Sequence, residues 1–134
     1  MTRKARQARS GAGSWAEQRL ALRRGRIIWV WVADGRGNRK RRPAIVLTPT
    51  AEITPGLPIA IMAITTSYPE PPPPMHIELP WHNDPRCVGT HLGKRCAAVI
   101  NWLRFVETEE VEEMAGDVPP KLMLEILRRL ENLP

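Results

Sequence analysis

The feature that most constrains the fold of this chain is a series of three short apolar stretches between residues 25 and 66, separated by turn residues. The first stretch, residues 26–32, reads Arg-Ile-Ile-Trp-Val-Trp-Val and is apolar on both of its alternating faces. β-Branched and aromatic side chains favour strands. A strand with two apolar faces is expected to be covered on both sides or to lie at a subunit interface. This region therefore predicts a β-rich fold.

Two further strands are predicted in the same region. Residues 34–38, Asp-Gly-Arg-Gly-Asn, are expected to form a turn, because glycine readily takes positive φ. The second strand covers residues 43–47 and begins at its proline, since proline cannot donate a hydrogen bond to a neighbouring strand. After a Thr-Pro-Gly turn, the third strand covers residues 58–66 and ends in two threonines.

The second half of the chain adds shorter strands and helices. Residues 75–79 predict a fourth strand, and residues 96–106 predict a strand or a bent strand pair. Thr108 is expected to cap a short acidic helix that ends at Gly116. The last helix is expected to start at Pro119-Pro120, and its apolar face consists of Met123, Ile126, Leu127 and Leu130. The predicted fold class is mainly β (α+β), a small and strongly bent barrel with peripheral helices.

The N-terminal segment differs from the rest of the chain in composition. Residues 1–13 are basic and lack large apolar side chains after Met1, which predicts a tail that is disordered when unbound. Ser14 and Glu17 have the spacing of a capping box and predict a short helix that ends near Arg24. A chain of 134 residues fits a single domain, which we assign to residues 14–134.

Charge is unevenly distributed along the chain. Residues 1–42 carry 13 of the 20 Lys and Arg and only 2 acidic residues, a formal charge of +11. Residues 107–134 carry 3 basic and 8 acidic residues, a formal charge of −5. This asymmetry favours binding of a polyanion by the N-terminal third. The alternative is a solvated basic tail without a specific partner.

Neither a signal-peptide apolar region nor an apolar run of membrane-spanning length is present, so we expect a cytoplasmic protein with no membrane association. The candidate metal ligands His82, Cys87, His91 and Cys96 lie within fifteen residues and could form a zinc set. Zinc sites usually contain a Cys-x₂₋₄-Cys pair, which this sequence lacks. The sequence therefore favours two unrelated buried thiols, and no metal or other cofactor is predicted.

Five segments resemble, in the same order, motifs of the MazF/PemK family of toxins from type II toxin–antitoxin systems. Residues 25–30 resemble its opening Gly-Asp-Ile-Val-Trp-Val strand, and residues 42–46, Arg-Pro-Ala-Ile-Val, resemble its Arg-Pro-Ala-Val-Val strand. Residues 63–66, Ala-Ile-Thr-Thr, resemble its Pro/Ala-Ile-Thr-Thr segment. Residues 74–79 are similar to its Pro-x-His-Val-x-Leu strand, and residues 99–107 fall where the family has Leu-x-Gln-Ile-Arg-Thr-Ile-Asp.

This resemblance extends over about residues 24–130 and implies a small SH3-like (CcdB/PemK-like) barrel with C-terminal helices, usually a homodimer. It also implies a metal-independent endoribonuclease that cleaves single-stranded RNA and is inhibited by a cognate antitoxin protein. The catalytic residues that it implies are Arg42 and Thr65. The RNA-binding residues expected beside them are Arg36, Arg39, Lys40, Arg41, Thr66 and His76.

The implied reaction suits an arginine and a threonine. Attack by the RNA's own 2′-hydroxyl would leave a 2′,3′-cyclic phosphate and a 5′-hydroxyl end, and DNA lacks this nucleophile. A guanidinium on the phosphate would stabilise the developing charge by about 3 kcal/mol, and a threonine hydroxyl can donate to a phosphate oxygen. The alternatives are that Arg42 is an ordinary strand-edge arginine and Thr65 an ordinary strand residue.

The chain also departs from the family pattern. Trp102 and Phe105 replace the family's Gln and Thr, and residues 36–41 form a basic loop where the family usually has an acid. These changes keep open a second interpretation, a catalytically inactive SH3-like module that binds nucleic acid or a protein. Trp29 and Trp31 alternate onto one face and either stack RNA bases or, as we favour, pack in the core or a dimer interface.

Overall fold

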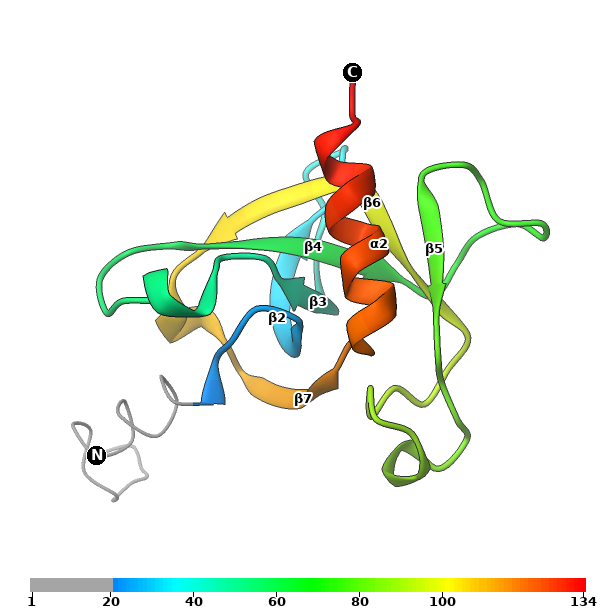
Figure 1. Ribbon diagram of the computed structural model, residues 1–134, viewed down its shortest axis with the longest axis horizontal. Coiled ribbons are helices and arrows are strands. Elements are labelled where there is room, and N and C mark those ends of the chain that lie inside the picture. Colours follow the sequence, from blue (N-terminus) through cyan, green and yellow to red (C-terminus); the bar gives the residue numbers. More distant parts are fainter. Residues whose placement is uncertain (1–20) are drawn as a thin grey trace.

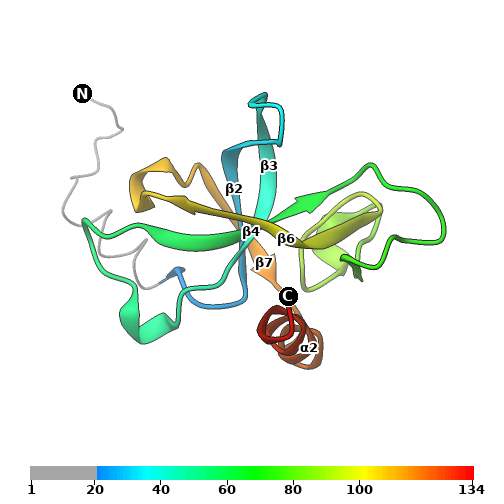
Figure 2. The ribbon, with the colours of Figure 1, turned by 90° about the horizontal axis from the view of Figure 1, so that it is seen from above.

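Six antiparallel strands and a C-terminal helix dominate the computed structural model, which describes residues 21–134 (Figure 1). The strands are β2 (Arg26–Ala33), β3 (Arg39–Val46), β4 (Ile59–Thr65), β5 (His76–Leu79), β6 (Cys96–Val106) and β7 (Glu113–Asp117), and the helix is α2 (Pro120–Glu131). They form one sheet in the order β5-β6-β4-β3-β2-β7. The strands cross and curl around one another, and Figure 2 shows α2 at the opposite end from the tip of the β2–β3 hairpin. The predicted mainly β fold with a C-terminal helix is confirmed.

Strand β2 has two buried faces, as its sequence predicts. Ile27 belongs to a cluster that includes Met123 and Ile126 of α2. Its neighbour Ile28 belongs to a second cluster that includes Val46. Burying each such side chain contributes about 1.5–3 kcal/mol to folding. The strand is therefore covered on both sides over its first half, whereas Trp31, on the same face as Ile27, is 44% exposed and does not pack in the core of the chain.

The turn predicted after β2 is confirmed, but β3 begins four residues earlier than predicted. Gly37 has a φ of 86°, and the side chain of Asp34 accepts hydrogen bonds from two turn amides. Residues 39–42 pair with β2, so that Pro43 lies inside the strand, opposite Trp29. The recorded pairing of β3 with β4 begins only at Ala44. Pro43 therefore lies where one edge of β3 has no strand partner, and its missing N–H removes no hydrogen bond there.

The predictions for β4, β5 and β6 agree with the structure to within about one residue at each end, and α2 begins where predicted, at Pro120. Strand β6 is a single strand whose pairing with β4 shifts register between Met62 and Ile64. On α2, Met123 and Ile126 are buried, as the periodicity predicts. No helix of the described part of the chain is long and apolar enough to cross a membrane.

The prediction of an acidic helix from Thr108 to Gly116 is wrong. Only Thr108–Glu110 is helical, as a 3₁₀ turn, and its capping box joins Glu107 and Glu110 rather than using the Thr108 side chain. The following residues form β7, which pairs with the outer edge of β2. The outer edge of β2 offers backbone hydrogen bonds to residues 113–117. Pairing with β2 therefore overrides the local helix preference of this acidic segment.

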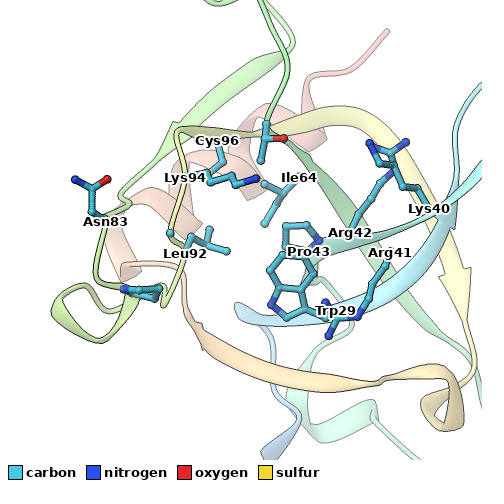
Figure 3. Close-up of a pocket in the computed structure, with 13 residues that line it drawn as sticks. Trp29, Lys40, Arg41, Arg42, Pro43, Ile64, Asn83, Leu92, Lys94 and Cys96 are labelled. Atoms are coloured by element: carbon cyan, nitrogen blue, oxygen red, sulfur yellow. The ribbon is translucent and has the colours of Figure 1, made fainter.

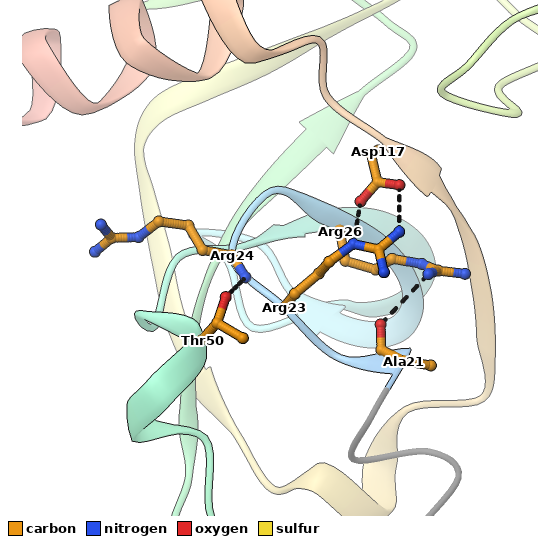
Figure 4. A network of polar contacts seen from close by, with 6 residues as sticks. All are labelled: Ala21, Arg23, Arg24, Arg26, Thr50 and Asp117. Atoms are coloured by element: carbon orange, nitrogen blue, oxygen red, sulfur yellow. Dashed lines mark hydrogen bonds and ion pairs between the residues drawn. The ribbon is translucent and has the colours of Figure 1, made fainter.

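The entry into β2 is fixed by polar contacts of neighbouring arginines (Figure 4). The Arg23 guanidinium donates to both carboxylate oxygens of Asp117, at 3.0 and 2.8 Å. The Arg24 amide donates to the Thr50 hydroxyl at 3.0 Å. These arginines belong to the basic N-terminal third, so part of its charge makes contacts within the fold. The predicted tail at residues 1–13 lies outside the described residues, as does most of the predicted helix that starts at Ser14.

Gly116 allows β7 to approach the loop after β5 closely. A Cβ atom at Gly116 would lie 1.8 Å from the carbonyl oxygen of Gly89, whose position is fixed by a hydrogen bond from the Asp117 amide. At Gly35, by contrast, an added Cβ would meet nothing within 4 Å.

We predict that Gly116→Ala lowers the free energy of unfolding by about 3 kcal/mol, because backbone atoms must move to make room. Gly35→Ala, the matched control, should change it by less than about 0.5 kcal/mol. Urea denaturation followed by tryptophan fluorescence measures both. Equal stabilities of the two variants would contradict the close approach described above.

Candidate active site

The two predicted catalytic residues lie on neighbouring strands and share a register position. In the β3–β4 ladder, Ala44 pairs with Ala63. Continuing this register by two residues sets Arg42 of β3 opposite Thr65 of β4. Opposite residues of an antiparallel pair project from the same face of the sheet. The β3–β4 ladder ends at the Ala44–Ala63 pair, so the extended register sets Arg42 and Thr65 on one face of the sheet without pairing them.

Arg42 is held by an aromatic ring rather than by an acid. Its guanidinium carbon lies 4.8 Å from the centre of the Trp102 ring. Its Nε atom is buried and has no hydrogen-bond partner among the described residues. No ion pair found among residues 21–134 includes Arg42. The cation therefore forms no ion pair within residues 21–134, although it lies near enough to Asp34 to help lower the pKa of that carboxyl group.

The hydroxyl group of Thr65 is engaged locally. It donates to the carbonyl of Ser67 and accepts from the Ser67 amide, both at 3.2 Å. The side chain is buried, with 9% of its surface exposed. Thr66, its neighbour, is exposed and lines a pocket beside Arg42. The two adjacent hydroxyls thus point in different directions at the end of β4.

The pocket has a volume of about 510 Å³ and opens where β3 and β4 separate (Figure 3). Its apolar part includes the Trp29 ring, which lies against Pro43, together with Ile64. Its polar part is basic and comes from β3 and from the loop before β6. The charged and amide side chains in the lining are Lys40, Arg41, Arg42, Asn83 and Lys94. Cations grouped around an apolar floor suit a phosphate and its attached base.

Arg41 differs from its neighbour because two carboxylates hold it. Its guanidinium donates to Glu112 at 2.9 Å and to Glu113 at 2.8 Å. These hydrogen bonds raise the pKa of Arg41, Glu112 contributing most. The guanidinium also lies 4.8 Å from the Trp29 ring centre, and Trp31 donates to the same Glu112 at 2.9 Å. Arg41 is therefore part of a charged network at the edge of the pocket.

The remaining predicted RNA-binding residues are dispersed. Of the six, Lys40, Arg41 and Thr66 line the pocket, whereas Arg36, Arg39 and His76 do not. Arg36 and Arg39 are exposed around the β2–β3 turn, with Arg39 4.0 Å from Glu110. His76 begins β5, half-buried, and its ring centroid lies 5.7 Å from that of Tyr68. Burial lowers its pKa and so favours the neutral imidazole.

The sequence did not single out Lys94 and Asn83 as site residues. Both lie between β5 and β6, where the sequence predicts neither a strand nor a helix, and Lys94 extends toward Ile64 (Figure 3). Lys94 is next to Arg95, so the sequence shows a basic pair there. That this loop lies at the pocket depends on the fold and could not be predicted from the sequence. Trp29 packs against the first cluster, as favoured, and also lines the pocket.

Within the described part of the chain, no three His, Cys, Asp or Glu side chains are close enough to hold a metal ion. The candidate ligands His82, Cys87, His91 and Cys96 are therefore not gathered there. Cys96 is buried, and burial raises its pKa to about 12. Cys87 is exposed, so the expectation of two buried thiols is wrong for this residue, which lies in a 3₁₀ turn of the loop.

These features define a class of small proteins with a curled antiparallel sheet, a C-terminal helix and a basic pocket between separating strands. Solved structures of the same fold include MazF from Deinococcus radiodurans, with a TM-score of 0.63 and 20% identity over 81% of this chain and 92% of that chain. They also include an endoribonuclease in complex with its cognate antitoxin from a mycobacterial species, with a TM-score of 0.60 and 16% identity over 84% and 97%. At these identities the likeness shows the fold alone.

Residues 23–133 match the family described as PemK-like, MazF-like toxin of type II toxin–antitoxin system. The match covers most of the chain, and the chain therefore belongs to this family. No curated protein sequence matches it significantly. The predicted family and the predicted barrel are confirmed.

We predict that the half-buried His76 makes the fold sensitive to mild acid. Because burial lowers its pKa, the unfolded chain binds a proton at His76 more readily than the folded chain does. The free energy of unfolding should therefore fall as the pH drops below about 6.5. His76→Gln should reduce this loss, as measured by urea denaturation between about pH 7 and pH 5. An imidazole NMR titration with a midpoint above about 6.5 would contradict the argument.

Proposed function

We propose that this chain is a metal-independent endoribonuclease toxin that cleaves single-stranded RNA and is inhibited by a cognate antitoxin. The observation that carries this proposal is the Arg42 guanidinium, which forms no ion pair among residues 21–134 and lies beside a basic pocket, opposite Thr65 in the extended β3–β4 register. The membership of a toxin family supports it, as does the fold shared with an endoribonuclease bound to its antitoxin. The proposal includes a homodimer in the cytoplasm as the functional form.

Arg42 has the main chemical role in this proposal. Its Nη atoms donate to the non-bridging oxygens of the scissile phosphate, where charge develops as the 2′-hydroxyl attacks. The products are a 2′,3′-cyclic phosphate and a 5′-hydroxyl end. Preorganisation is the source of the rate increase, because a fixed cation needs no reorientation during the reaction. The Trp102 ring lies beside the Arg42 guanidinium and helps to hold it in place before the substrate binds.

Thr65 and the pocket residues hold the substrate. The Thr65 hydroxyl can exchange its local bond to Ser67 for one to a phosphate oxygen, since hydroxyl groups rotate to suit a new partner. Lys40 and Lys94 face the same pocket and bind adjacent phosphates. An unstacked base fits against the Trp29 ring, as in other single-strand binding sites.

We predict that Arg42→Ala lowers the rate of RNA cleavage about 100-fold or more, because one preorganised donor is lost. The assay follows a fluorescent single-stranded RNA in EDTA and identifies the 3′ ends by mass spectrometry. Arg128→Ala, at an exposed position of α2 outside the pocket, is the matched control and should retain the wild-type rate. A DNA strand of the same sequence should stay intact.

Three outcomes would contradict the proposal. Equal cleavage by the wild type and Arg42→Ala would reject the site, and loss of cleavage in EDTA would reject the metal-independent mechanism. RNA binding by the wild type without any scission would leave the catalytically inactive binding module as the function. The Trp102 and Phe105 departures from the family pattern favour that second candidate.

We predict that releasing Arg41 strengthens RNA binding. The double variant Glu112→Gln, Glu113→Gln removes both carboxylates that hold Arg41. One additional phosphate contact should steepen the dependence of log affinity on log salt concentration by about 0.7 for a single strand. Fluorescence anisotropy with an uncleavable 2′-O-methyl RNA measures this slope.

The control for this experiment changes the same charge elsewhere. Glu109→Gln with Glu131→Gln also removes two negative charges, at exposed positions whose carboxylates form no ion pair with Arg41. This variant should keep the wild-type salt slope. Equal slopes in the two double variants would show that net charge, rather than Arg41, controls the affinity.

A further inference from the structure

Trp102 contacts the candidate catalytic arginine at a position where the chain departs from its family's pattern. The family resemblance places a Gln here, whereas this chain has an indole ring 4.8 Å from the Arg42 guanidinium carbon. This distance is within the range of a cation–π interaction, which tryptophan makes more strongly than other aromatic residues. The replacement therefore changes what holds Arg42.

The indole ring is itself fixed by the fold. Its Nε1 donates to the carbonyl of Ala33 at the end of β2, at 3.1 Å. Arg104 donates to the same carbonyl, also at 3.1 Å. The ring is half-buried and packs against the second core cluster, whose members include Val30 and Ala63. Hydrogen bond and packing together leave the ring little freedom to rotate.

An aromatic ring and a carboxylate have different effects on an arginine. Arg41 is held by carboxylates, and Glu112 and Glu113 occupy its hydrogen-bond donors. Arg42 is held by an aromatic ring. The face of the ring attracts the cation and leaves the in-plane N–H donors of the guanidinium free of the ring. The Nε of Arg42 is buried without a partner in the described chain, so the Nη groups remain as its outward donors.

We propose that Trp102 is the positioning residue for Arg42, holding its guanidinium in the orientation that binds the scissile phosphate. This inference rests on the proposed ribonuclease function. Trp102 does not touch the reacting atoms in this arrangement. It acts through Arg42, and its effect is on the rate of the chemical step rather than on substrate binding.

The activity experiment compares two substitutions in the full-length protein. Trp102→Leu removes the aromatic face and should lower kcat for RNA cleavage about tenfold, with KM changed less than about twofold. Trp102→Phe keeps a ring without the indole donor and should restore kcat to within about threefold of the wild type. A wild-type kcat in Trp102→Leu, or an equal loss in both variants, would overturn the positioning role.

A second readout does not need catalysis. A side chain above a ring has upfield-shifted NMR resonances, so the Arg42 δ-protons of the wild type should lie upfield of their position in Trp102→Leu. Random-coil shifts of these protons in the wild type would overturn the inference even if a variant failed to fold. A wild type that shows the shift but does not cut RNA would reject the proposed ribonuclease while retaining the Arg42–Trp102 contact.

Discussion

The burial of β2 on both faces is the constraint on which the rest of the structure depends. Ile27 and Ile28 face different core clusters, while β3 and β7 pair with the two edges of the strand. A one-residue slip would exchange the two faces, so the register is strongly specified. This register sets Arg42 opposite Val30 and Arg41 opposite Trp31. The core thereby decides on which face each arginine projects.

Two adjacent arginines consequently have opposite electrostatic surroundings. Arg41 projects toward the edge strand and meets Glu112 and Glu113. Arg42 projects toward the second cluster and meets the face of Trp102. Within a few ångströms of a carboxylate, a cation has much of its field cancelled, whereas a ring leaves its net charge unchanged. Of the two, only Arg41 forms ion pairs within the described residues.

Much of the fold could be predicted because the strands carry their own signals. Strands β2 and β4 are rich in β-branched residues and bounded by turns, and the order of the motifs indicated the family. β7 could not be predicted, since Glu-Met-Ala-Gly-Asp has little strand preference and forms one only against the open edge of β2. Lys94 was missed for a similar reason. Its loop has no periodic pattern, and only the packing of the fold brings it to the pocket.

The uneven charge of the sequence also has a different meaning in the folded protein. The basic N-terminal third and the acidic C-terminal segment are in contact, through the pairs Arg23–Asp117, Arg39–Glu110, Arg41–Glu112 and Arg41–Glu113. A formal charge of +11 over residues 1–42 therefore overstates the field that a polyanion meets. The cations without an ion pair around the pocket, within the described residues, are Lys40, Arg42 and Lys94. Since the acidic segment compensates Arg39 and Arg41, the unpaired cations of the pocket lie where β3 and β4 separate.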